Sequence, residues 1–409
     1  MKRHALLTTA LLSAATLAWG SGFQVGSQGV RQLGMGGTGT SVPWDASTIF
    51  YNPGGLARLE GMQAIASVQF LTVNTKWAST PVQSLEARTR EEFFTPFNAY
   101  VGGTLRSLDR LGFGLGVYTP FGNGMSWSED WPGRYLVQSV SMRTIFFQPT
   151  VSYRISEAVS VGAGLMYGIG QFNMSRALPL QDVNGVEGQA KIDANGNGTG
   201  MNFGVHVKAS DALQFGLTYR TQVNMDFSGD AELNVPYALR PQFPSTGVSM
   251  DIPLPQVISL GVGFKPFETL TIQAEASLTG WKVFDSLGFR FDEQTDALRD
   301  AKSARHYQNT LAFRLGGLLQ ASENVQLMLG GYYDPTPVED GFVSPDLPDS
   351  DRWAVSGGLT VRIGDSFTVL GAVEFGHSET RTAEFRPDNF NGKYGAKAFT
   401  ANIGLSYDF

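Results

Sequence analysis

The chain has 409 residues, of which 42% are hydrophobic, 12% aromatic and 16% charged, with 49 glycines and no cysteine. Its 30 Lys and Arg against 37 Asp and Glu give a net charge of −7, which argues against a nucleic-acid partner. Without cysteine the chain has neither a disulfide framework nor thiol chemistry. Few charges together with many glycines and aromatic residues suit a β-barrel whose outer face meets lipid.

Residues 1–20 have the pattern of a secretion signal. Lys2 and Arg3 precede a short apolar stretch, and Ala18-Trp19-Gly20 places small residues at the −3 and −1 positions of a cut after Gly20. The stretch is shorter than the ~20 residues of a membrane-spanning helix, and no later apolar run reaches ~18 residues. We therefore expect a signal peptide at 1–20 and no helical membrane span after it.

Residues 21–60 do not alternate and are predicted to form a plug, or hatch, inside a barrel. The segment holds nine glycines together with apolar residues such as Phe23, Trp44 and Phe50. A fourteen-stranded barrel has a lumen too wide for its own side chains to fill. A disordered periplasmic tail is the alternative, but the segment is too apolar for one.

Residues 61–409 are predicted to form the barrel wall, because they break into fourteen segments of alternating apolar and polar residues. In the last segment, 399–409, apolar groups occupy every second position up to Phe409, over the ~9–11 residues that a tilted strand needs to cross a bilayer. In 212–228 apolar residues from Leu213 to Phe227 share one face, which is expected to point outward. The fourteen segments are 61–77, 93–106, 111–119, 134–155, 159–172, 199–208, 212–228, 251–265, 268–285, 306–321, 324–335, 351–363, 366–384 and 396–409.

Connection lengths distinguish the two ends of this barrel. Six joints are tight, such as 156–158 and 364–365, and they alternate strictly with seven longer joints, such as 78–92 and 173–198. Short turns at one end, long loops at the other and an even strand number are typical of outer-membrane barrels. The sequence thus predicts an all-β, fourteen-stranded antiparallel transmembrane barrel in a bacterial outer membrane, and a soluble sandwich is the alternative.

Several motifs resemble those of the outer-membrane fatty-acid and hydrocarbon transporters, the FadL/TodX group, over the whole mature chain. Each motif is short, and their order and spacing carry the resemblance. They are Ser21-Gly22-Phe23-Gln24, Tyr51-Asn52-Pro53-Gly54, Leu254-Pro255, Gly280-Trp281, the run from Pro345 to Trp353, and the terminal Phe409.

The resemblance implies a monomeric barrel that takes up hydrophobic molecules, fatty acids or hydrocarbons, by passive diffusion. Uptake would pass a hatch and leave through a lateral opening at a kinked third strand, and the barrel's other partners would be outer-membrane lipid and lipopolysaccharide. The chain departs from the family twice. Asn-Pro-Gly replaces the usual Asn-Pro-Ala, and the loop 173–198 is polar where the best-known members carry an apolar helical hairpin. A surface capture groove is therefore not expected.

Two sets of residues are predicted to control passage. Phe23, Asn52, Pro53 and Gly54 are the hatch and gating residues. The residue before a proline is pushed to extended geometry, and a short amide can satisfy nearby backbone groups. The second set is Gly112, Gly114 and Gly116, which lie on one face of the predicted third strand and are expected to form the lateral opening. Glycines on one face remove side-chain bulk from the wall and permit a bend. The alternative is that these glycines only make room for the hatch.

Four more residues are candidates for the ligand path. Glu275 and Arg314 fall on inward faces of neighbouring strands. They could form an ion pair that fixes the wall, or Arg314 could hold a carboxylate headgroup, for which a guanidinium is well shaped. Phe94 and Tyr100 could line an apolar path or contact the hatch.

No cofactor, metal site or enzymatic activity is predicted. The run 193–198 copies half of a calcium loop but has Gly204 where the acid is required, so a flexible loop tip is expected. A hydrolase needs a nucleophile, base and orienting group in contact, and His206, His306 and His377 do not share a site on this topology. A polar porin and a lipid hydrolase are the alternative functions, and the cargo stays open.

Overall fold

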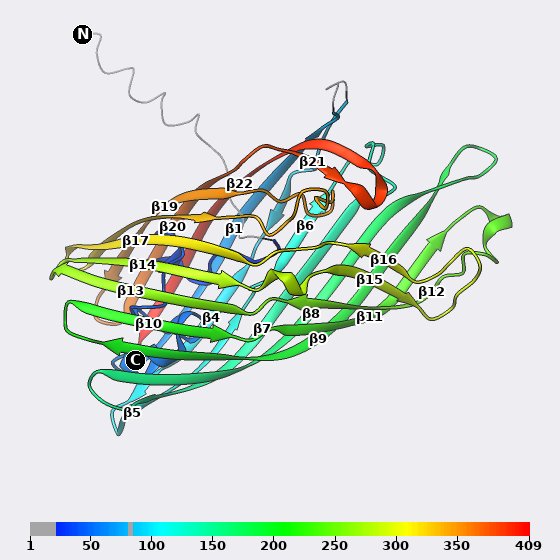
Figure 1. Ribbon diagram of the computed structural model, residues 1–409. Helices are drawn as coiled ribbons and strands as arrows, with labels where there is room; N and C mark the ends of the chain where they lie inside the picture. Colours follow the sequence, from blue (N-terminus) through cyan, green and yellow to red (C-terminus); the bar gives the residue numbers. More distant parts are fainter. Residues whose placement is uncertain (1–21, 81–84) are drawn as a thin grey trace, which may run out of the picture.

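The chain folds into a closed antiparallel β-barrel with fourteen wall positions (Figure 1). The computed structural model describes residues 22–80 and 85–409, so the predicted signal peptide lies outside the described residues. β22 pairs with β1 along nearly the whole length of β1, which closes the sheet. Among the described residues no helix is long and apolar enough to cross a bilayer. The predicted all-β, fourteen-stranded fold is confirmed.

Half of the wall positions are continuous and half are interrupted. The continuous strands of the described residues are β1 (Met62–Ala78), β7 (Ser139–Arg154), β8 (Val159–Gln181), β9 (Glu187–Lys208), β18 (Val325–Asp334), β19 (Arg352–Ile363) and β22 (Phe390–Asp408). The interrupted positions are β3 (Glu92–Phe94) with β4 (Phe97–Leu105), β5 (Leu108–Tyr118) with β6 (Gly122–Ser126), β10 (Leu213–Arg220) with β11 (Val223–Asn234), β12 (Thr246–Leu254) with β13 (Val257–Phe267), β14 (Leu270–Thr279) with β15 (Ser286–Phe291), β16 (Ala301–Ala304) with β17 (Thr310–Ser322), and β20 (Phe367–Ser378) with β21 (Arg381–Phe385).

The remaining elements are short. β2 (Glu86–Arg88) pairs with the far end of β1. The helices are α1 (Val30–Gly34), α2 (Thr48–Tyr51), η1 (Pro53–Arg58), η2 (Tyr237–Leu239), η3 (Trp281–Val283) and η4 (Arg386–Asp388).

Several of the longer joints contain strands, and one of them is almost entirely a strand pair. β8 and β9 continue through the predicted loop 173–198 as a paired hairpin whose turn is 182–186. The prediction of a loop tip at 193–198 is therefore wrong, because Asp193 lies in β9 opposite Asn173 and Asp230. Beyond the membrane both faces of such a hairpin can be wetted, so polar residues and glycines are compatible with the ladder.

The wall changes face part-way along its height. In β10 the side chains of Phe215, Leu217 and Tyr219 are exposed, whereas in β11 Val223 and Phe227 are buried. Arg220 lies opposite Asn202, but Asp226 lies opposite Asn197, so the register with β9 slips by one residue between them. A one-residue slip turns every following side chain to the other face. The predicted single outward face of 212–228 is therefore wrong beyond Thr221.

The neighbouring position makes the same switch across Pro255 and Gln256. Ile258 and Leu260 of β13 point outward and are exposed, whereas Ile252 and Leu254 of β12 are buried. The barrel thus has two parts. In the membrane part the apolar face is outside, and in the part beyond it, here called the collar, the apolar face lines the interior.

This division predicts where a charge is tolerated. Leu217→Arg places a cation on the lipid-facing side of β10 and should lower the free energy of unfolding by about 2–4 kcal/mol. Ser228→Arg, on the exposed outer face of β11 in the collar, should change it by less than about 0.5 kcal/mol. Urea titrations of both variants in lipid vesicles measure the difference, and equal costs would contradict the two-part wall.

Candidate transport path

The N-terminal segment, residues 22–60, contacts the wall on several sides (Figure 1, blue ribbon). The backbone N–H of Gly36 donates to Ser356 Oγ of β19 at 2.9 Å. Gln148 Nε2 of β7 donates to the carbonyl of Ile49 at 2.7 Å. Helix η1 packs against β7, β8 and β9. Because these strands lie apart around the barrel, the segment is enclosed by the wall.

Asn52 joins two parts of this segment to the wall. Its Nδ2 donates to the carbonyl of Thr40 at 2.7 Å and to that of Val205 at 3.1 Å, and its Oδ1 accepts from Gly54 N at 3.0 Å. Its φ of −156° is extended, as expected before Pro53, which begins η1. The side chain therefore satisfies three backbone groups.

The departure from Asn-Pro-Ala has a steric reason. A Cβ on Gly54 would lie 2.8 Å from the carbonyl oxygen of Gly204, and one on Gly162 would lie 2.4 Å from the carbonyl oxygen of Pro53. Segment and wall thus meet backbone to backbone here, and glycine is the residue that fits.

Phe23 lies in a group of aromatic rings near the far end of the segment. Its ring centroid is 4.8 Å from that of Trp281, 5.2 Å from Phe284 and 6.1 Å from Phe121. The backbone N–H of the preceding Gly22 donates to Asp349 Oδ2 at 3.2 Å. The first described residues are therefore packed against the residue before β6 and against the segment between β14 and β15.

Gly112, Gly114 and Gly116 face the N-terminal segment. A Cβ on Gly114 would lie 2.5 Å from Ile49 Cδ1, and one on Gly112 would lie 2.8 Å from Ala57 N. All three glycines are paired with β4 on one side and β7 on the other. The wall is closed at this height, and these glycines make room for the N-terminal segment.

The third wall position, β5 with β6, is interrupted just after these glycines. β5 ends at Tyr118 and β6 begins at Gly122, with Pro120 between them. Beyond the paired residues Asn98 and Tyr118, β3 pairs with β1 and β6 pairs with β7. Within the described ranges β3 and β6 share no ladder, which leaves a gap between the second and third wall positions.

The N-terminal segment supplies the hydrogen bonds that a neighbouring strand would otherwise make at the gap. Gln28 Nε2 donates to the carbonyl of Thr119 at 3.1 Å, and Thr119 N donates to Gln28 Oε1 at 3.2 Å. Val25 N donates to the carbonyl of Pro120, and Gly122 N to that of Phe23, both at 2.9 Å. The broken strand is therefore paired with residues 23–28.

A cavity of about 370 Å³ lies at this gap. Its lining includes the outward-facing Phe93, which is 67% exposed, together with Val25 and Leu33 of the N-terminal segment. Residues from both sides of the wall thus line one space. Phe94 also lines it and covers Gly124.

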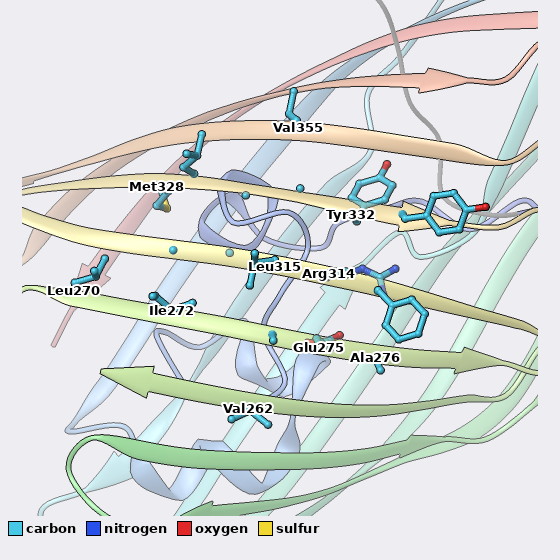
Figure 2. A pocket seen from close by; sticks show the side chains of 18 of the residues that line it. Val262, Leu270, Ile272, Glu275, Ala276, Arg314, Leu315, Met328, Tyr332 and Val355 are labelled. Atoms are coloured by element: carbon cyan, nitrogen blue, oxygen red, sulfur yellow. The ribbon is translucent and has the colours of Figure 1, made fainter. Parts of the chain in front are cut away.

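Glu275 and Arg314 lie opposite each other on β14 and β17 (Figure 2). Glu275 Oε2 accepts from the backbone N–H groups of Gly39 at 3.1 Å and Thr40 at 3.0 Å. In the described part of the chain these two residues form no ion pair within 4 Å. Both line a small cavity of about 80 Å³ beside Gly37. Glu275 therefore anchors the N-terminal segment.

Tyr100 is buried and its hydroxyl donates to the carbonyl of Gln28 at 2.9 Å. Arg220, which the sequence analysis does not single out, lies over the Phe50 ring at 3.8 Å and donates to the Phe50 carbonyl at 2.9 Å. Both residues hold the N-terminal segment. Arg220 stands on the polar face of a predicted strand, but nothing in the alternation distinguishes it from its neighbours.

The collar encloses a second cavity, of about 400 Å³. Arg176 of β8 lines it, with Asp388 from η4 also present, and no ion pair of Arg176 occurs among the described residues. The polar segment 173–198 is a hairpin whose inner face carries apolar residues, and these line part of the cavity. Its apolar lining includes Met174, Leu178, Ile192, Leu233, Leu287 and Phe289.

A third depression, of about 1150 Å³, lies on the outer face of β13, β14 and β17–β19 (Figure 2). Outward Ile272, Leu315 and Val355 line it, and Gly317 and Gly331 leave it hollow. It faces the membrane and lies outside the path described above.

The three described histidines lie apart. His206 contacts Gln214 Oε1 at 2.9 Å, His306 contacts Asp285 Oδ1 at 2.8 Å, and the His377 ring lies 5.8 Å from that of Trp353. In the described residues no group of three or more His, Asp or Glu could hold a metal ion.

A family model described as outer membrane protein transport protein (OMPP1/FadL/TodX) matches residues 11–409. The chain belongs to this family. It is 26% identical to an outer membrane protein of Neisseria meningitidis serogroup B, over 99% of this chain and 97% of that one. It is 22% identical to the long-chain fatty acid transport protein of Escherichia coli K12, over 100% of both chains.

Two solved structures of OMPP1/FadL/TodX members share the fold. A Pseudomonas aeruginosa FadL homologue superposes with a TM-score of 0.83 at 18% identity, covering 95% of this chain and 100% of that one. The Ralstonia pickettii toluene transporter TbuX gives 0.74 at 16% identity, covering 94% and 99%. The protein is thus an outer-membrane transport barrel, as the sequence predicts.

Asn52→Ala tests the junction between segment and wall. Loss of the amide removes its hydrogen bonds to the carbonyls of Thr40 and Val205 and from Gly54 N, at a cost of about 1–3 kcal/mol. We expect a lower urea midpoint and a higher ion leak in planar bilayers. Asn195→Ala, on the exposed outer face of the collar, is the matched control. An unchanged leak in Asn52→Ala would show that the amide does not hold the segment.

Proposed function

We propose that this family member takes up amphiphilic hydrophobic molecules of the fatty-acid type and releases them sideways into the bilayer. Cargo would enter at the collar cavity, pass the N-terminal segment and leave through the gap between the second and third wall positions. The observation that carries this proposal is the cavity lined by Phe93 outside and Val25 inside. A sideways exit avoids exposing apolar surface to water, which costs about 25 cal/mol per Å².

In this proposal the chain has three parts: a signal peptide at 1–20, a hatch at 21–60 and a barrel at 61–409. The hatch is the barrier, with Phe23, Asn52, Pro53 and Gly54 fixing its position. The sequence predicts the lateral route at Gly112, Gly114 and Gly116. We propose that it lies at Thr119–Gly122 instead. Transport is passive, because diffusion down a gradient into lipid needs no nucleotide.

The headgroup site is placed at Arg176 rather than Arg314. Arg176 lines the collar cavity beside apolar side chains and forms no ion pair within 4 Å among the described residues, and a guanidinium fits a carboxylate bidentately. Other basic residues, among them Lys191 and Lys302, offset the charge of Asp388 in this cavity. Arg314 lies opposite Glu275, in the zone that the N-terminal segment fills. Tyr100 and Phe94 then line the later part of the path, beside the hatch and the gap.

The rival functions have less support. A polar porin needs an open aqueous lumen, whereas residues 22–60 contact the wall on several sides. A lipid hydrolase needs neighbouring catalytic groups, and the three histidines lie apart. We propose a monomer without enzymatic activity, surrounded by outer-membrane lipid and lipopolysaccharide.

Gly122→Trp tests the lateral exit. A Cβ on Gly122 would meet only Met142 O at 3.4 Å and Val25 Cγ2 at 3.8 Å, so an indole can enter the cavity without a backbone clash. We expect uptake of labelled oleate and of toluene to fall at least about tenfold, with normal assembly. The assay uses cells that lack their own transporter.

Gly371→Trp is the matched control, because nothing lies within 4 Å of its Cβ on the lipid-facing side of β20. Gly114→Leu is a poor substitute, since it would collide with Ile49 and disturb the hatch. Normal uptake by an assembled Gly122→Trp protein would rule out an exit at this gap.

Arg176→Gln tests the cargo class. Without the guanidinium, oleate should bind about tenfold more weakly, since a charge-assisted pair contributes roughly 1.5–3 kcal/mol. Toluene, which has no headgroup, should be taken up as before. Arg240→Gln, beside Tyr237 at the collar rim, is the control. A parallel loss of oleate and toluene uptake would contradict a headgroup role.

A further inference from the structure

The outer face of the wall carries a cluster of basic residues just beyond the membrane part. Lys76 of β1 and Arg88 of β2 are exposed and lie directly opposite each other. On the other side of β1, Lys76 lies opposite Gly395 of β22. Lys393 occupies a position of β22 diagonal to Lys76. Three basic side chains thus meet on one outward face.

This arrangement is unfavourable without a counter-charge. Residues directly opposite in an antiparallel pair have Cβ atoms ~4.5–5.5 Å apart, and diagonal neighbours ~7–8 Å, so like charges repel. In the described part of the chain, Lys76, Arg88 and Lys393 form no ion pair within 4 Å. Glu86 shares this outward face with Arg88, and Glu384 of β21, opposite Asn391, is paired with Arg386 at 3.0 Å. On the collar, by contrast, the facing acids Asp226 and Asp251 have a counter-charge, because Arg290 lies 2.7 Å from Asp251.

The height of the cluster is set by an aromatic belt beneath it. Phe70 and Phe93 face outward with ring centroids 6.3 Å apart, and Phe375 and Phe399 continue the belt at 5.2 Å. Outward aromatic girdles mark the interfaces of outer-membrane barrels. Lys76 lies six residues beyond Phe70 and Arg88 five before Phe93. The cations therefore stand just above the hydrocarbon, at the level of lipid headgroups.

We propose that this cluster, Lys76, Arg88 and Lys393, binds the phosphate groups of lipopolysaccharide in the outer leaflet. Phosphate is the anion available at this height in an outer membrane, and several phosphates on one glycolipid match several cations on one face. Each Lys or Arg near a membrane surface contributes about 1 kcal/mol of attraction to anionic lipid headgroups. The site rests on the outer-membrane placement and is independent of the proposed cargo route.

The site also has a position relative to the gap. β2 and β3 belong to the same connection, and Phe93 of β3 lines the cavity in the wall. A lipopolysaccharide molecule held at Lys76 and Arg88 would therefore stand beside the gap. A bound lipopolysaccharide molecule would then stay beside the gap, where an unbound lipid would exchange with others.

The test compares lipid binding by two triple variants of the purified full chain in detergent. Lys76→Gln/Arg88→Gln/Lys393→Gln removes three cations of the cluster. Arg106→Gln/Arg110→Gln/Lys265→Gln removes three exposed cations at the tight-turn end. Native mass spectrometry measures bound bisphosphorylated lipid A. Each cation near an anionic surface strengthens attraction roughly fivefold, so the first variant should bind at least about tenfold more weakly and the second as the parent.

A second arm needs no variant. The unaltered protein should bind bisphosphorylated lipid A at least about tenfold more tightly than lipid A stripped of its phosphates, and added salt should reduce the difference. Equal binding of the two lipids would overturn the proposal, as would equal loss in both triple variants. Oleate uptake by the cluster variant separates the ideas: lost lipid A binding with unchanged uptake supports the site and leaves the cargo route standing.

Discussion

A backbone N–H or carbonyl that faces lipid must find a partner within the protein, because the hydrocarbon offers none. Around most of the wall each strand is paired with a neighbour on both sides, and the pairing of β1 with β22 leaves no free edge between the first and last strands. Pairing on both sides fails where the third wall position breaks at Pro120, and there the hatch provides the missing bonds through Gln28 and residues 23–25. The N-terminal segment is thus a hydrogen-bonding partner for the broken strand. If it is also the barrier, as we propose, cargo has to pass it without removing these bonds.

The slip of one residue between Arg220 and Val223 has a consequence for transport. Below it the barrel interior is polar and bonded to the hatch, as at Asn202 and Glu275. Above it the interior is apolar, because the outside of the collar meets water and its apolar face must turn inward. On the proposed route an amphiphile would meet the apolar interior of the collar first and reach the polar zone, which the N-terminal segment fills, at the height of the gap. An exit there would avoid a further descent into a polar interior, which is unfavourable for an apolar chain.

Period-two alternation and the sorting of tight and long joints were enough to predict the fourteen-stranded barrel. The same alternation could not reveal the slip, because Tyr219 and Val223 keep the same parity while facing opposite sides. The segment 173–198 was predicted as a loop for a related reason. The outer face of β9 is polar, and a polar outer face excludes a wall strand only where the wall is surrounded by lipid. At the gap the useful signal was Pro120, a residue that cannot donate to a ladder, and not the glycines that precede it. Glu275, Tyr100 and Asn52 could be placed on inward or turn positions, but their hydrogen bonds to the hatch depend on contacts between residues far apart in the chain.

The hatch is fastened unequally around its circumference. On the side of β18 a Cβ on Gly36 would lie 2.4 Å from Gly331 N, and near β10 a Cβ on Gly216 would lie 1.9 Å from the carbonyl oxygen of Thr40. Such backbone contacts leave no side chain that could rotate to admit a molecule. On the side of the gap two backbone hydrogen bonds, from Val25 N to Pro120 O and from Gly122 N to Phe23 O, stand beside the side-chain bonds of Gln28, and Val25 and Ser27 line a cavity. Close-packed interfaces move as units whereas side chains turn singly. On the proposed route cargo would therefore pass where side chains line this cavity, and not where the segment and the wall meet backbone to backbone.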